Sequence, residues 1–96
     1  MFAIIVEFKG ATNSNPSRMT VKSMYQSKAK TIHYPALNTL PDGFDYASPK
    51  DCSRYAAQCH LDELNEKAKS TFLTLGDYFQ GVNNDQRIWA VKMEVL

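Results

Sequence analysis

One segment of this chain has the pattern of a helix, and the apolar residues on both sides of it follow the pattern of strands. The helical segment begins at Ser48-Pro49-Lys50-Asp51, where serine can cap the first turn, proline fits it, and the acid can reach back to the cap. We expect it to end near Lys69. Its apolar stripe at helical spacing consists of Ala56, Ala57, His60, Leu61, Leu64 and Ala68.

The residues before the helix alternate between apolar and polar, as half-buried strands do. Residues 2–9 form the first predicted strand, with one apolar face made of Phe2, Ile4, Val6 and Phe8. Residues 18–24 and 28–34 form the second and third, joined by Tyr-Gln-Ser as a hairpin turn. Residues 35–48 are predicted to be a loop, because Pro-Asp-Gly within them is turn chemistry.

Two more strands are predicted after the helix. Residues 72–79 form the first, with a bulge or bend at Gly76-Asp77, and residues 88–95 form the last, after a turn at 82–86. The last strand places Trp89, Val91, Met93 and Val95 on one face. The order βββαββ predicts a single α+β domain over residues 1–96, with an antiparallel sheet of about five strands and one main helix packed on one face.

The cysteines and the apolar runs indicate the cellular compartment of the protein. Cys52 and Cys59 are seven residues apart, roughly 10 Å along a helix, whereas a disulfide needs α-carbons within about 7 Å. We therefore expect free thiols and a reducing compartment. The start, MFAIIVEFKG, is a poor signal peptide, and no apolar run is long enough to span a membrane. A cytoplasmic location is the expectation.

The sequence lacks the motifs of common active sites. It contains no glycine-rich phosphate loop, no G-x-S-x-G, no H-E-x-x-H and no standard zinc spacing. The two histidines, His33 and His60, fall on different predicted elements, and His60 on the apolar stripe is interpreted as a core histidine. We expect no enzymatic activity, no metal and no cofactor.

Charge is unevenly distributed along the chain. Residues 1–35 carry five cations and one anion, whereas residues 36–96 carry six cations and nine anions, which together give the net charge of +1. This split points to an anionic partner for the first half, although strands often carry lysine on a solvated face.

The first predicted hairpin supplies the candidate binding site. Its polar loop offers backbone N–H groups and amide side chains, and the arginine at its exit can form paired hydrogen bonds to phosphate or carboxylate. The candidates for hydrogen bonding are Thr12, Asn13, Asn15 and Arg18, and those for electrostatic attraction are Lys22, Lys28 and Lys30. The alternative is a loop that hydrogen-bonds to itself, with Arg18 bridging to Glu7 across the hairpin.

The stretch KGATNSNPSRM, residues 9–19, resembles the first hairpin of small uncharacterised proteins from phages, plasmids and integrated elements. That hairpin reads strand, Gly-Pro-Thr-Asn-x-x-Gly-Ser-Arg, then a hydrophobic residue. Tyr34-Pro35 at the end of the third strand, the alanine-rich helix and the final hairpin extend the likeness in layout, but not in motif. The chain departs from the pattern at Ala11, at Asn15-Pro16 and in an expanded loop over 37–47.

The resemblance implies a biological setting. Small proteins of mobile elements often inhibit host defence, and some anti-CRISPR proteins are single α+β domains of this size. It implies a non-enzymatic inhibitor that binds a multi-subunit Cas surveillance complex in the host cytoplasm, near its crRNA, and blocks target-DNA binding. Two alternatives stay open: a small nucleic-acid-binding accessory protein that uses the basic hairpin, and a structural or dimeric protein that pairs through an exposed sheet edge.

Overall fold

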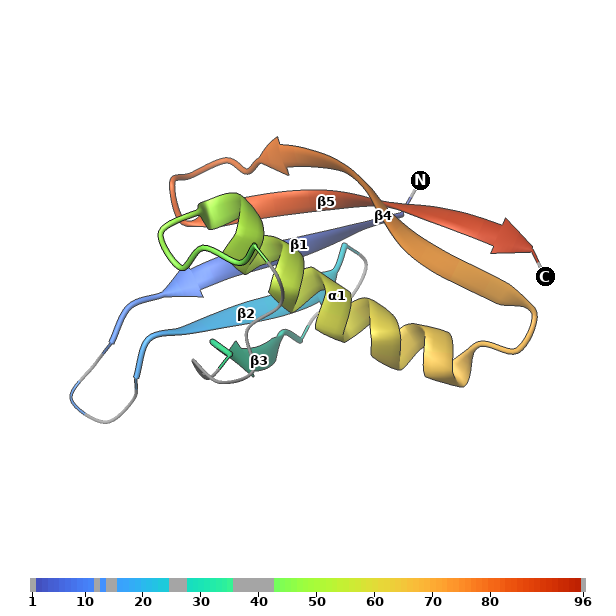
Figure 1. The fold of residues 1–96 in the computed structure, drawn as a ribbon, viewed down its shortest axis with the longest axis horizontal. Helices are drawn as coiled ribbons and strands as arrows, with labels where there is room; N and C mark the ends of the chain where they lie inside the picture. The colour runs from blue at the N-terminus through green and yellow to red at the C-terminus, as the bar shows by residue number, and fades with distance from the viewer. Residues whose placement is uncertain (1, 12, 14–15, 25–27, 36–42, 96) are drawn as a thin grey trace.

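Five strands pair into one antiparallel sheet, and a single long helix lies across one of its faces (Figure 1). The structure is a computed structural model that describes residues 2–11, 13, 16–24, 28–35 and 43–95. The elements are β1 (Phe2–Lys9), β2 (Arg18–Ser23), β3 (Lys30–His33), α1 (Pro49–Lys67), β4 (Thr71–Gln80) and β5 (Gln86–Val95). The strand order is β3-β2-β1-β5-β4, and every pair is antiparallel. The predicted α+β class and the βββαββ order are therefore confirmed.

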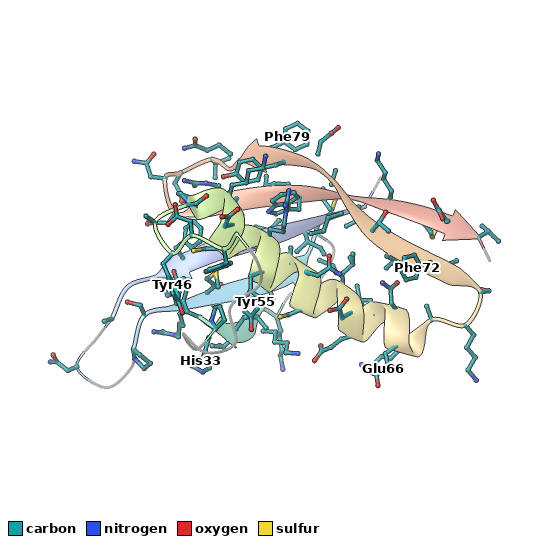
Figure 2. All side chains as sticks on the ribbon, viewed as in Figure 1. His33, Tyr46, Tyr55, Glu66, Phe72 and Phe79 are labelled. Atoms are coloured by element: carbon teal, nitrogen blue, oxygen red, sulfur yellow. The ribbon has the colours of Figure 1, made fainter. Side chains whose placement is uncertain are left out.

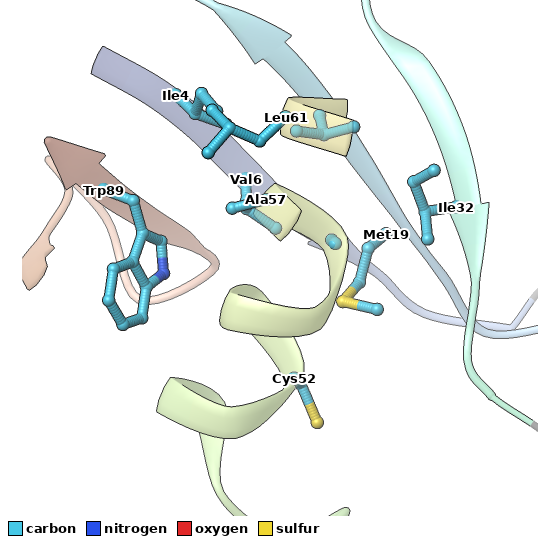
Figure 3. Close-up of a cluster of buried hydrophobic side chains, with 10 residues drawn as sticks. Ile4, Val6, Met19, Ile32, Cys52, Ala57, Leu61 and Trp89 are labelled. Carbon is cyan, nitrogen blue, oxygen red and sulfur yellow. The ribbon is translucent and has the colours of Figure 1, made fainter. Parts of the chain in front are cut away.

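The core lies between α1 and the inner face of the sheet (Figure 3). The central strand β1 places Ile4 opposite Trp89 and Val6 opposite Val21, and all four side chains are buried. Ala56 and Ala57 of α1 are fully buried above them, because alanine lets the helix backbone approach the sheet closely.

The start of α1 follows the prediction in part. Ser48 caps the helix, since its Oγ accepts the Asp51 N–H at 3.2 Å, and Pro49 occupies the first turn. The predicted return bond from Asp51 to the cap is wrong. Instead, the Asp51 carboxylate accepts the Asp45 N–H at 3.1 Å and so ties the preceding loop to the helix.

Several predicted boundaries are also wrong, and β5, for example, begins at Gln86 rather than at residue 88. The helix ends at Lys67 rather than near Lys69, because Ala68 already has extended backbone that leads into β4. The third strand covers Lys30–His33 rather than residues 28–34, and it pairs with β2 alone. The predicted Tyr-Gln-Ser turn lies outside the described residues.

The sheet contains the predicted irregularity at Gly76-Asp77, where the pairing of β4 with β5 shifts register between Leu75 and Tyr78. At the far end of this hairpin, Met93 and Val95 are 65% and 80% exposed, although they share a face with buried Trp89. They are exposed because the first residue of β1, Phe2, pairs with Val91. The rest of β5 extends beyond β1 and has no described strand paired on that side.

Candidate functional site

The predicted binding residues of the first hairpin are divided between the loop and the open face of the sheet. Asn13 is exposed in the loop, whereas Thr12 and Asn15 lie outside the described residues. Arg18 is the first residue of β2, and its Nη1 donates to the Pro16 carbonyl at 3.4 Å. Lys22 shares a face with it, because both alternate with the buried side chains of β2.

The open face carries a row of basic side chains across three strands. Pairing places Lys9 of β1 opposite Arg18 of β2, and Arg18 opposite His33 of β3. Figure 2 shows His33 at the β3 edge of the sheet and Phe79 at the opposite edge. The row therefore occupies the β3 side of the sheet, at the end where the first hairpin loop begins.

Glu7 is the acid that compensates this row in part. Its carboxylate forms an ion pair with Lys9 at 3.1 Å, so the suggested bridge from Glu7 to Arg18 does not form. Lys22 and Arg18 have no acidic partner among the described residues. A shallow hollow of about 200 Å³ lies beside them, lined by Ile5, Glu7, Lys9, Thr20, Lys22 and Ala29.

Of the other two predicted lysines, Lys30 lies on the opposite side of the sheet. Lys30 lies opposite Val21, which places it on the helix side of the sheet, where it forms an ion pair with Glu63 of α1. The hydrogen bond from the Lys30 ammonium lowers the pKa of the Glu63 carboxyl. Lys28 is exposed ahead of β3. The structure thus brings together Arg18 and Lys22 and separates Lys30 from them.

A second cationic surface, which the sequence reasoning missed, lies on the helix side. Lys50 and Arg54 from the first turns of α1 and Arg87 from β5 gather around Tyr78 and Trp89, and we call these three cations the Lys50–Arg54–Arg87 cluster. Lys50 Nζ lies 5.8 Å from the centre of the Tyr78 ring, and the Arg54 guanidinium lies 5.2 Å from the centre of the Trp89 ring. Arg87 Nε donates to Tyr78 Oη at 2.9 Å.

One sequence signal could have pointed to part of this cluster. Lys50 and Arg54 are four residues apart near the start of the predicted helix, so they share a helical face. These two cations were overlooked because residues 36–96 carry more acidic than basic side chains overall. Arg87 could not be connected to them from sequence, because only the pairing of β4 with β5 and the position of α1 bring it to Tyr78.

An aromatic pocket of about 140 Å³ lies at the beginning of α1. It is lined by Phe8, Tyr34, Tyr46, Ala47, Pro49 and Cys52. The Tyr46 hydroxyl donates to the Pro35 carbonyl and holds the loop before α1 against the end of β3. Burial, with the nearby Asp51 and Asp45, raises the pKa of the Cys52 thiol, so this thiol is a weak nucleophile. Cys52 and Cys59 are both free, as predicted.

A buried serine and histidine lie within hydrogen-bond distance in the core. Ser23 Oγ and His60 Nε2 are 3.0 Å apart, and both residues are at most 6% exposed. Such a pair has the atoms of a nucleophile and a base, but both side chains are buried in the core. His60 is a core histidine, as interpreted, but it is not fully satisfied, because its buried Nδ1 has no hydrogen-bond partner among the described residues.

Within the described ranges, no three His, Cys, Asp or Glu side chains are grouped so as to hold a metal ion. The described part of the chain also contains no helix with the length and apolar character needed to cross a membrane. In comparisons with known proteins, no family model, curated protein or solved structure matches this chain.

Proposed function

We propose that this chain is a non-catalytic binding protein of a mobile element that inhibits a multi-subunit Cas surveillance complex and blocks its binding of target DNA. The observation that carries the proposal is the open face of the sheet. No described helix or strand covers this face, and its β1–β2 part presents Lys9, Arg18 and Lys22 against the single carboxylate of Glu7.

The face has the mixed character of a protein interface. Pairing places Phe79, Ile88 and Ile5 in one row across β4, β5 and β1, and Lys22 continues that row on β2. Phe79 is 51% exposed, and the two isoleucines are half-buried. An apolar centre with a charged margin is the usual anatomy of a protein–protein contact.

The sign of the charge suggests where on a Cas complex this face docks. A cationic surface is attracted to the phosphates of the guide RNA or to acidic protein, and it is repelled by the basic channel that receives DNA. The proposed inhibitor therefore covers the DNA path from a site next to the guide rather than by imitating DNA.

A target-DNA shift assay with a panel of type I Cas complexes tests this proposal. Saturating protein is expected to abolish DNA binding by one complex, and a pull-down should recover the two together. Arg18→Ala with Lys22→Ala should weaken inhibition about tenfold or more, because two charged contacts are lost.

The matched control is Lys67→Ala with Lys69→Ala, which removes the same charge at the far end of α1 and should inhibit like the unmodified protein. If DNA binding by every complex is unchanged at saturating protein, the proposal is wrong. The same conclusion follows if the control pair loses as much activity as the Arg18 and Lys22 pair.

A further inference from the structure

We propose that the Lys50–Arg54–Arg87 cluster is a binding site for the phosphates of a nucleic-acid strand. This site lies on the helix side of the sheet, whereas Arg18 and Lys22 lie on the open face. The inference therefore does not depend on the proposed inhibition of a Cas complex. It rests on the placement, the fixation and the unused hydrogen-bond donors of three cations.

The placement of Lys50 and Arg54 is unfavourable for the isolated helix. They lie one turn apart on α1, and like charges at this spacing repel each other. They also lie near the end of the helix where its dipole favours anions over cations. A bound anion would offset the repulsion between the two cations and would itself be stabilised by the helix dipole. Anion binding therefore explains an arrangement that does not stabilise the fold.

No carboxylate of the described residues forms an ion pair with the cluster. The ion pairs among them join Lys9 to Glu7 and Lys30 to Glu63, and neither involves the cluster. Asp51 lies beside Lys50 in the chain, but its carboxylate accepts the backbone N–H of Asp45.

Hydrogen bonds and ring contacts fix Arg87 in position. Its Nη1 donates to the carbonyls of Asn84 and Gln86 at 2.8 and 2.9 Å, its Nε donates to Tyr78, and its guanidinium lies 5.5 Å from the centre of the Phe8 ring. These bonds leave the two N–H groups of Nη2 without a partner in the described part of the chain. An arginine held in this way has already lost the side-chain freedom that binding would otherwise remove.

The other donors converge on the same place. The Arg54 guanidinium lies against the Trp89 ring and makes no hydrogen bond to the described residues, and Lys50 lies against Tyr78. The Tyr78 hydroxyl accepts from Arg87, so its own proton remains available to an anion. Trp89 is itself anchored, because its indole N–H donates to Ser53 Oγ at 2.9 Å.

The number and geometry of these donors favour phosphate over carboxylate. Two guanidinium groups, an ammonium and a phenol offer more donors than the two oxygens of one carboxylate can accept, whereas successive phosphates of a strand supply many acceptor oxygens. Trp89 is buried, so the rings hold the cations in place rather than stack bases, and the cations supply the charge that follows a phosphate backbone. We therefore assign the site to a nucleic-acid strand.

Fluorescence anisotropy with a labelled 20-nucleotide single strand, as DNA and as RNA, tests the assignment at 50 and 200 mM NaCl. Binding is expected at 50 mM salt and should fall steeply at 200 mM. Lys50→Ala with Arg54→Ala should raise Kd about tenfold or more and reduce the salt slope by about one to two. Arg87→Lys keeps the positive charge but removes the paired N–H donors of the guanidinium. It should raise Kd by a smaller factor than the Lys50 and Arg54 double change.

The control is again Lys67→Ala with Lys69→Ala, with circular dichroism to check that each variant is folded. No binding at 50 mM salt overturns the proposal, as does an equal loss in the control pair. Inorganic phosphate at 10 mM should compete only weakly; if phosphate binds at the cluster and the strands do not, the site takes a small anion and the proposal is wrong. Arg18→Ala with Lys22→Ala should weaken strand binding less than Lys50→Ala with Arg54→Ala, whereas it should weaken inhibition of the Cas complex more, so this proposal and the proposed function fail separately.

Discussion

Single polar residues orient the largest side chain of the core. Trp89 is 2% exposed, and its indole N–H donates to Ser53 Oγ, which is fully buried. Ser53 Oγ in turn donates to the Lys50 carbonyl at 3.1 Å, so one hydroxyl links the indole to the first turn of α1. Ser53 therefore positions the ring that supports Arg54 and also bonds to the backbone of Lys50, another member of the cluster.

Ser53→Ala should lower the free energy of unfolding by about 1–3 kcal/mol, because it leaves a buried indole N–H without an acceptor. Urea denaturation followed by circular dichroism measures this change, because Trp89 is the chain's single tryptophan and two variants of the cycle below lack it. Trp89→Phe and the double variant complete a mutant cycle, in which the double change should cost clearly less than the sum of the single ones. Additive costs would show that the hydrogen bond contributes nothing to stability.

His60 should make the stability of the fold depend on pH. Burial lowers the pKa of this imidazole and Lys30 of β3 lowers it further, while Glu63 of α1 opposes the shift. The unfolded chain therefore takes up a proton near pH 6.5 that the folded chain resists, and stability falls as pH drops below that value.

Comparing the free energy of unfolding at pH 7.5 and 5.5 tests this effect, with His60→Gln as the variant in which the loss over this interval should be smaller. Glu63 should not contribute to the change between pH 7.5 and 5.5. Its pKa is lowered, so its contribution to stability is lost at a pH below this interval. If the glutamine variant keeps the full pH dependence, His60 is not its source.

At the scale of elements, a side-chain amide joins α1 to the edge strand β4. Asn65 Nδ2 donates to the Leu73 carbonyl at 2.9 Å, and the Leu73 N–H donates to Asn65 Oδ1 at 2.7 Å. These are the backbone groups of Leu73 that point away from β5, where a further strand would otherwise pair. The amide thus occupies part of the exposed edge of the sheet.

Asn65→Ala should destabilise the protein by about 1–3 kcal/mol, since two hydrogen bonds to partly buried backbone are lost at about 0.5–1.5 kcal/mol each. Thermal or urea unfolding measures the loss. Gln58→Ala is a suitable control, because it removes an exposed amide bonded to Asp62 on the outer side of the same helix. Equal effects from the two changes would mean that the contact with β4 has no special role.

The elements that could be predicted are those whose local pattern is strong. Alternation identified β1 and β5, and Ser48-Pro49 located the start of α1, because periodicity and capping are encoded within a few residues. Gly76-Asp77 located the bulge, where an added Cβ on Gly76 would lie 3.3 Å from Lys92 Cε.

What could not be predicted depends on contacts between distant segments. The length of β3 is set by its pairing with β2, and the side on which Lys30 lies is set by its register opposite Val21. The candidate lysines were grouped because they are close in sequence, but neighbouring residues of a strand point to opposite faces. The cluster around Tyr78 joins a helix to a hairpin and has no local signature.

On the scale of the whole molecule, the sheet has two edges and neither offers a long uninterrupted strand. β3 contains four residues, and β4 is interrupted by the bulge at Gly76-Asp77 and by the amide of Asn65 at Leu73. Short, bulged and covered edges are the means by which proteins avoid pairing edge to edge. This arrangement argues against the alternative of a dimer built through a sheet edge.

Light scattering should therefore give a mass near 10.9 kDa at micromolar concentration, which is the mass of one chain. Asn65→Ala should shift the chain toward larger species at higher concentration, because it uncovers backbone groups of β4. A stable dimer of the unmodified protein would contradict this view of the edges and would restore the dimeric alternative.

Cations on both sides of the sheet give the domain two separate candidate surfaces that can bind at the same time. The molecule measures 23 Å along its shortest axis, and Arg18 with Lys22 face away from Lys50, Arg54 and Arg87 across that thickness. If both proposed sites bind, the domain can hold two polyanionic segments at once, because they attach to opposite sides of the sheet. Two weak attachments to the same ribonucleoprotein would then act as a single tight one, and a tethered second contact can strengthen attachment by factors of about 10²–10⁴.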